Sequence, residues 1–166
     1  MDVVVQDAST LLNLLKSGLL QCAVEALELH ILTTDLVAAE IKSPKAAFDA
    51  AVSRGWIEVR SFSALELIGF ATERQKAKGL SIQDVSVVAL ARNVGCPLFS
   101  SDGPVRNYAA RCNLTVRGEL WILDQLVGLK ALKPVEAAAK LEKMMENKAR
   151  LPMKEVQERI AKWSAG

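Results

Sequence analysis

Short apolar runs alternate with helix-forming segments along the first two thirds of the chain, and this alternation restricts the fold more than any other feature. Val3–Val5 is a continuous β-branched run, which is typical of a strand buried on both faces of a parallel sheet. Further strands are expected at 30–33, 56–60, 97–101 and 114–116. Helices are expected at 9–16, 22–29, 35–41, 45–54, 64–78, 81–93 and 105–112, the sixth of them strongly amphipathic. The pattern predicts an α/β fold with a mostly parallel sheet and right-handed crossovers.

The chain becomes wholly helical after Gly118, with apolar stripes expected in segments 119–128, 134–148 and 153–163. The stripes of the last two helices are Val135, Ala138, Leu141 and Met145, then Met153, Val156, Ile160 and Trp163. We therefore expect a main domain over residues 1–130 and a helical extension over 131–166 that packs on it. A tail that binds a partner is the alternative for this extension.

Composition limits the classes of protein that fit. The 166 residues suit about one domain, and a net charge of +2 leaves any nucleic-acid binding to a local patch. Three cysteines without a C-x-x-C pair argue against a disulfide framework and a zinc knuckle, and favour a reduced, cytoplasmic protein. No apolar stretch approaches the ~18 residues of a membrane span, and no secretory signal is recognised, so we expect no membrane association.

Four acids are expected at one edge of the sheet. Asp7 follows the first strand, Asp102 follows the strand at 97–101, and Asp84 opens the helix that precedes that strand. Glu40 lies late in the helix after the second strand and can lean back to the same edge. Ligands of open parallel sheets bind at the carboxyl ends of the strands, so this edge is the candidate site.

Carboxylates gathered on one rim need a cation or a raised pKa. Two unit charges ~4 Å apart repel by about 4 kcal/mol at an effective dielectric of ~20. Oxygen ligands without His or Cys select Mg²⁺ or Mn²⁺ over zinc, and such an ion suits phosphodiester hydrolysis. Arg106, one helical turn after Asp102, is placed to hold a phosphate of the substrate, although a solvated or paired arginine is the alternative.

Each acid also has a purely structural interpretation. Asp7 can cap the helix that follows it, and Ser81 with Asp84 can form a capping box. Asp102 with Gly103 is a common turn pair, and Glu40 can be a solvated helix residue.

Four motifs in order resemble a PIN domain, the class of metal-dependent ribonucleases that includes VapC-type toxins of toxin–antitoxin pairs. They are Asp7-Ala8-Ser9 after a valine strand, Glu40 at a helix end, Ser81–Asp84 opening an alanine-rich helix, and Ser101-Asp102 after an apolar strand. The resemblance covers about residues 2–128. Val116–Leu120 and the helices after it look like a prokaryotic PIN variant with a C-terminal helical extension.

The resemblance implies a three-layer sandwich with about five strands in the order 3-2-1-4-5. It implies an endoribonuclease that cleaves single-stranded RNA with Mg²⁺ or Mn²⁺. The family that the chain resembles includes toxins that pair as homodimers and bind an antitoxin protein. The acidic site would be Asp7, Glu40, Asp84 and Asp102, with Asp7, Asp84 and Asp102 as metal ligands. By motif position, Ser9 would orient Asp7 or a water, and Ser100 or Ser101 is the hydroxyl before the last acid.

Other functions fit less well or remain as alternatives. A receiver domain needs an acid after the third strand, where this chain has Val59-Arg60-Ser61. Glycine-rich phosphate-binding motifs are absent from the sequence. The alternative that remains is a non-catalytic module with the same fold, which binds a protein through its C-terminal helices and uses the acids as caps.

Overall fold

The computed structural model describes residues 2–165 and contains one five-stranded, all-parallel sheet in the order β3-β2-β1-β4-β5. The strands are β1 (Asp2–Gln6), β2 (Leu29–Thr34), β3 (Ile57–Arg60), β4 (Leu98–Phe99) and β5 (Val116–Arg117). The helices are α1 (Ala8–Lys16), α2 (Leu20–Ala26), α3 (Asp35–Glu40), α4 (Lys45–Ser53), α5 (Ala64–Lys76), α6 (Ile82–Val94), α7 (Gly103–Arg111), α8 (Glu119–Gly128), α9 (Pro134–Glu146) and α10 (Met153–Ser164). The expected fold class and strand order are confirmed.

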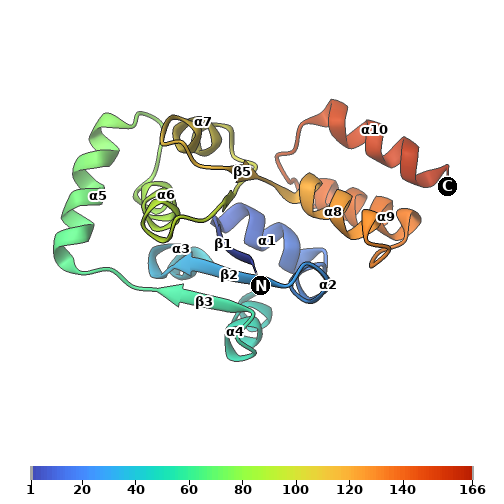
Figure 1. Ribbon diagram of the computed structural model, residues 1–166, viewed down its shortest axis with the longest axis horizontal. Helices are drawn as coiled ribbons and strands as arrows, with labels where there is room; N and C mark the ends of the chain where they lie inside the picture. Colours follow the sequence, from blue (N-terminus) through green and yellow to red (C-terminus); the bar gives the residue numbers. More distant parts are fainter. Residues whose placement is uncertain (1, 166) are drawn as a thin grey trace.

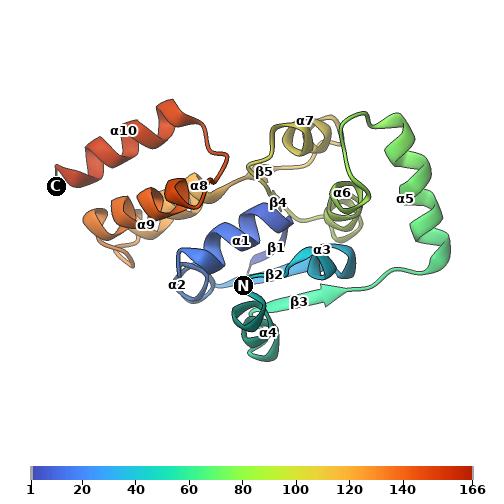
Figure 2. The ribbon, with the colours of Figure 1, turned by 180° about the vertical axis from the view of Figure 1, so that it is seen from behind.

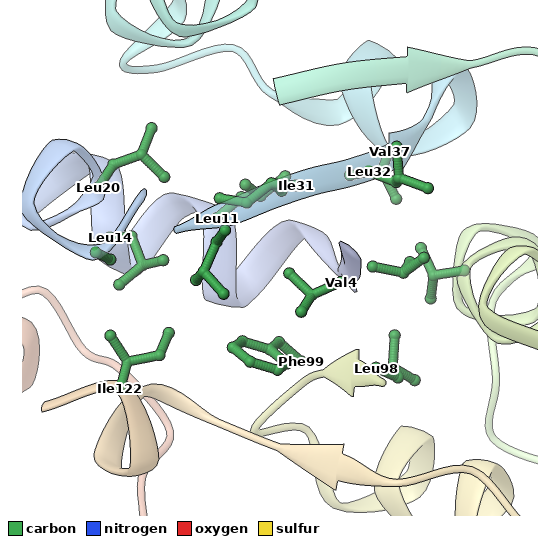
Figure 3. Packing of buried hydrophobic residues seen from close by; sticks show 14 of the residues in the cluster. Val4, Leu11, Leu14, Leu20, Ile31, Leu32, Val37, Leu98, Phe99 and Ile122 are labelled. Atoms are coloured by element: carbon green, nitrogen blue, oxygen red, sulfur yellow. The ribbon is translucent and has the colours of Figure 1, made fainter. Parts of the chain in front are cut away.

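Helices cover both faces of the central strand. Val4, Val5 and Gln6 are consecutive in β1 and are all buried, although neighbouring side chains of a strand point to opposite faces. α6 packs along β2, β1 and β4, whereas α1, α2 and α8 contact one another as a second group. Figure 3 shows side chains of β1, β4, α1 and α8, among them Val4, Phe99, Leu11 and Ile122, gathered in one apolar interior.

The molecule is elongated, with α5 at one end and α9 and α10 at the other, on either side of the sheet (Figure 1). The reverse view shows the same arrangement, with α8 between the sheet and the last two helices (Figure 2). Leu141 and Met144 of α9 and Val156 and Trp163 of α10 belong to the same apolar cluster as the sheet residues.

β3 and β4 are shorter than the expected 56–60 and 97–101, and the boundaries of β2 and β5 differ from expectation for local backbone reasons. Glu28 has a positive φ of 50° that ends the helical turn, and Leu29 then pairs with Asp2, so β2 begins one residue early and α2 covers 20–26 instead of 22–29. The N–H of Leu114 still donates to Ala109 O of α7 (3.0 Å), so β5 pairs through Val116 and Arg117 instead of 114–116.

The expected faces of α6 and α9 are wrong, whereas that of α10 is wrong only at Met153, since Val156 and Trp163 are buried. α6 buries Val85, Ser86, Val87 and Val88 in succession, so it is a core helix and not a strongly amphipathic one. Val135 and Met153 are 60% and 54% exposed. In α9 the buried face is Ala137, Ala138, Leu141 and Met144, which is rotated by about one residue from the expected stripe. Helical periodicity alone cannot tell which neighbour a helix packs against.

Candidate functional site

Asp7 lies at the carboxyl end of β1 and is only 4% exposed. Its N–H donates to Phe99 O (3.3 Å), which extends the β1–β4 pairing by one residue. Oδ1 accepts a hydrogen bond from the N–H of Thr10 (2.9 Å) and so caps α1. Oδ2 accepts a hydrogen bond from the Ser100 hydroxyl. The carboxylate is therefore fixed between the first strand, its helix and β4.

Burial raises the pKa of Asp7 to about 6. The hydrogen bonds from Ser100 and Thr10 favour the charged form and oppose this rise, whereas the nearby negative charge of Glu119 adds to it. A carboxyl group that is hard to ionise when alone is one that a bound cation would stabilise strongly.

Ser100 links the acids of two neighbouring strands. Its hydroxyl oxygen accepts a hydrogen bond from the N–H of Asp102 (3.2 Å) while it donates to Asp7. Oδ1 of Asp102 accepts from the N–H of Val105 (3.1 Å) and caps α7. The two acids expected at this edge are thus connected through one side chain.

Glu119 is an additional acid that the sequence analysis did not select. It is fully buried at the start of α8, where Asn13 Nδ2 donates to Oε1 (2.6 Å) and the Ser101 hydroxyl donates to Oε2. The preceding Gly118 passes so close to β4 that a Cβ there would lie 2.5 Å from Ser101 Oγ. An acid in the first turn of a helix is common and does not by itself mark a site. The only sequence signal for Glu119 was therefore the glycine before it, which allows the backbone to lie close to Ser101.

Glu40 and Asp84 form a second acidic pair. Glu40 ends α3 and is exposed, and its pKa is raised by partial burial and then by the charge of Asp84. Asp84 Oδ2 accepts from the N–H of Ser81 (2.8 Å), and Asp84 N–H donates to Ser81 Oγ (3.1 Å), which completes the expected capping box of α6. A hydrogen bond between the Thr34 and Ser86 hydroxyls (2.9 Å) joins β2 to α6.

The three aspartates all cap helices, as the structural interpretation expects, yet each uses one oxygen for this. Within residues 2–165, no hydrogen bond is found to Oδ1 of Asp84 or to Oδ2 of Asp102. Carboxylate oxygens are the donors that Mg²⁺ and Mn²⁺ prefer, so the donor chemistry fits. In the part of the chain that is described, however, no three His, Cys, Asp or Glu side chains already stand in an arrangement that could hold a metal.

Residues 3–165 match the sequence model of DUF3368, a PIN domain. The chain belongs to this PIN-domain family. The resemblance found in the four acidic motifs is thereby confirmed.

One sequence relative and one solved structure are similar to this PIN domain. A segment of 88 residues, 52% of the chain, is 36% identical to endoribonuclease Nob1 of Methanocaldococcus jannaschii, and it covers 44% of that protein's length. The chain therefore spans less than half of this curated relative. A PilT N-terminus domain protein from Sulfolobus solfataricus P2 has the same fold, with a TM-score of 0.51, 18% identity, and coverage of 76% of this chain and 92% of that one.

The remaining predicted site residues of this PIN domain lie near Asp102. Ser9 is exposed at the start of α1 and lines a cavity of about 250 Å³ together with Ser101 and Asp102. Arg106 is exposed, and its Nη1 donates to Ser100 O (2.8 Å) at the same edge. Its guanidinium has no carboxylate partner within residues 2–165. No helix formed by the described residues is both long and apolar enough to cross a bilayer.

Proposed function

We propose that this PIN domain is a divalent-metal-dependent endoribonuclease that cleaves single-stranded RNA. The observation that carries the proposal is the buried Asp7, whose pKa is raised to about 6 while Ser100 connects it to Asp102 at the end of the neighbouring strand. Its family and the endoribonuclease relative support the same chemistry. We also propose a cytoplasmic location, as the reduced cysteines suggest.

We assign the metal to Asp7, Asp84 and Asp102, as one ion, or two when the substrate phosphate adds ligands. Bound Mg²⁺ or Mn²⁺ would offset the negative charge on a phosphoryl oxygen and would lower the pKa of a bound water. Holding one ion with all three ligands would require both Asp84 and Asp102 to turn the oxygen that is not used for capping toward Asp7. Glu119, which is buried and acts on Asp7 through its charge, adds negative charge that favours a cation.

Different side chains have different roles in the proposed hydrolysis. Glu40, whose pKa is raised, accepts a proton from the attacking water as the water oxygen adds to phosphorus. One P–O ester bond breaks, and the leaving oxygen takes up a proton. Ser9 orients Asp7 or the water, Ser101 lines the cavity beside Asp102, and Arg106 holds a phosphate of the strand.

The toxin of a toxin–antitoxin pair is the cellular role that we propose for this nuclease. In that role the chain forms a homodimer, and an antitoxin protein covers the acidic cleft with an arginine that reaches the carboxylates. Co-expression with a small neighbouring reading frame tests it. Relief of growth arrest supports the role, and unchanged growth on expression of the chain alone contradicts it.

The capping bonds of all three aspartates favour one alternative, a non-catalytic PIN module that binds a protein through α8–α10. A cleavage assay separates the two. Purified protein with Mn²⁺ should cut a labelled single-stranded RNA, and Asp7→Asn should reduce the rate by at least 100-fold, roughly the loss expected for removing a metal-centred charge. Asp49→Asn, an exposed aspartate of α4, is the matched control and should cleave normally. Full activity of Asp7→Asn contradicts the nuclease proposal.

A further inference from the structure

A cavity of about 790 Å³ lies beside the acidic edge, between β5, the start of α8 and the beginning of α10. Ser101 and Arg106 line its wall nearest Asp102. The smaller cavity at Asp102 shares Ser101 and Arg150 with it, so the two adjoin. In both ribbon views the loop that leads into α10 lies beside β5 and the start of α8 (Figure 1 and Figure 2).

Four of the residues that line the larger cavity are arginines. Arg159 is paired with Asp124 (2.6 Å) and with Glu155 (3.8 Å), the two acids of the cavity. For Arg106, Arg117 and Arg150 no ion pair is found within residues 2–165. Three guanidinium groups without carboxylate partners therefore face one cavity in a chain whose net charge is only +2. Such a local excess suits a polyanion.

Positive charge continues past Asp102. The smaller cavity is lined by Lys16 of α1 and by Lys148 and Arg150 of the loop between α9 and α10. Cationic side chains thus line both cavities, and Asp102 lines the smaller one. A strand whose phosphates contact both cavities would pass close to Asp102.

The larger cavity also holds a flat stack. The guanidinium of Arg117 lies over the ring of Trp121, 4.3 Å from its centroid, and Phe99 supports that ring edge-on at 5.4 Å. Unstacked bases of single-stranded RNA pack on aromatic rings and on arginine planes. The arginine–tryptophan stack is a surface for one such base.

We propose that the two adjoining cavities form one groove that binds single-stranded RNA. Arg106 and Arg150 bind phosphates, and the Arg117–Trp121 stack receives a base. The inference rests on the proposed nuclease function for its choice of polyanion, but it concerns binding alone. The volume is in the range of a pocket for a small ligand, which admits a nucleotide or two of an unpaired strand but not a duplex. The helical extension is then part of the substrate site.

The test measures fluorescence anisotropy of a labelled single-stranded RNA in EDTA, where no cleavage occurs, over a series of salt concentrations. Arg150→Ala should weaken binding about 5- to 20-fold and reduce the slope of log K against log[salt] by about 0.7, the value for one phosphate contact on a single strand. Arg117→Lys keeps the positive charge but removes the planar guanidinium group on which a base can stack. It should therefore weaken binding with little change in the slope of log K against log[salt]. Arg117→Ala loses both the plane and the charge, so it should weaken binding more than Arg117→Lys does and should also reduce the salt slope.

Arg54→Ala is the matched control, because Arg54 also lies over a tryptophan, 4.8 Å from the centroid of Trp56, and lines neither cavity. It should bind RNA as the unaltered protein does. Equal binding by Arg54→Ala, Arg117→Ala and Arg150→Ala overturns the groove. So does equal affinity for duplex RNA, or displacement of the RNA by polyglutamate at matched charge, which would indicate an acidic protein partner instead.

The outcomes separate the groove from the nuclease. Weakened binding by the arginine variants in a protein that never cleaves RNA with Mn²⁺ supports the groove and contradicts the catalytic proposal. Normal binding by those variants in a protein that cleaves RNA contradicts the groove and supports the catalytic proposal. Circular dichroism melting of each variant verifies folding. Because Arg150 is an exposed loop residue, Arg150→Ala tests the groove even if the Arg117 variants are unstable.

Discussion

Ser100 donates a hydrogen bond from its hydroxyl to Oδ2 of Asp7 while the same hydroxyl oxygen accepts from the N–H of Asp102. One buried side chain thereby positions the acids of β1 and β4. Serine suits this place because its single hydroxyl both donates and accepts. The contact also favours the ionised form of Asp7 and so lowers its pKa against the effect of burial.

Replacing Ser100 should therefore impair the site without removing a ligand. Ser100→Ala should lower kcat/KM for RNA with Mn²⁺ by about 10- to 100-fold, as is typical for groups that orient metal ligands. The pKa of Asp7 should rise further, because the hydrogen bond that lowers it is gone. Carboxyl NMR titration measures the pKa, and a steady-state assay measures the rate. An unchanged pKa of Asp7 would show that the contact does not form in solution.

Stability should depend on pH through Asp7 when no metal is present. Its pKa is raised from 3.8 to about 6 in the folded chain, so the folded state binds the proton more tightly than the unfolded state. This contribution is complete below pH ~4 and is lost as pH rises through about 6. In EDTA, the free energy of unfolding of the unaltered protein relative to Asp7→Asn should fall by up to about 3 kcal/mol between these limits. Urea denaturation measures it, and a difference independent of pH contradicts it.

Gly118 should tolerate no side chain as long as Ser101 keeps its position. A Cβ at residue 118 would lie 2.5 Å from Ser101 Oγ, whose hydroxyl donates to Glu119. Gly118→Ala should cost about 1–2 kcal/mol, through overpacking or through loss of that hydrogen bond. In a Ser101→Ala background the same change should cost less than half as much. Equal costs in both backgrounds, measured by urea denaturation, would rule out this contact as the cause.

Glu119 should act on Asp7 through its charge. Its negative charge raises the pKa of Asp7, so Glu119→Gln should lower that pKa while it keeps the shape of the side chain. Carboxyl NMR titration checks the direction. Glu142→Gln, an exposed acid of α9, serves as the comparison and should leave Asp7 unchanged. A rise of the Asp7 pKa in Glu119→Gln would mean that the two carboxylates are not coupled as described.

The sequence predicted the sheet well because its signals are local. Val3–Val5 fits a strand covered on both faces, and the capping box of Ser81 with Asp84 marks the start of α6 within one residue. The acids at the ends of β1 and β4 could be placed together because parallel strands bring their carboxyl ends to one edge.

The rest of the site depends on contacts between distant segments. Glu119 is held by Asn13 and Ser101, which lie 106 and 18 residues away along the chain, and no local pattern encodes that meeting. The exposure of Val135 likewise depends on where α9 packs. The boundary between 1–130 and 131–166 stays a prediction, as do the roles of the individual acids.

A crystal grown in Mn²⁺ tests the metal site most directly. Asp7, Asp84 and Asp102 are expected to turn their oxygens toward a common centre, with an anomalous scattering peak between them that disappears in Asp102→Asn crystals grown alike. An empty edge in saturating Mn²⁺, with the Asp84 and Asp102 oxygens still confined to capping α6 and α7, would contradict the assignment of these carboxylates to a metal.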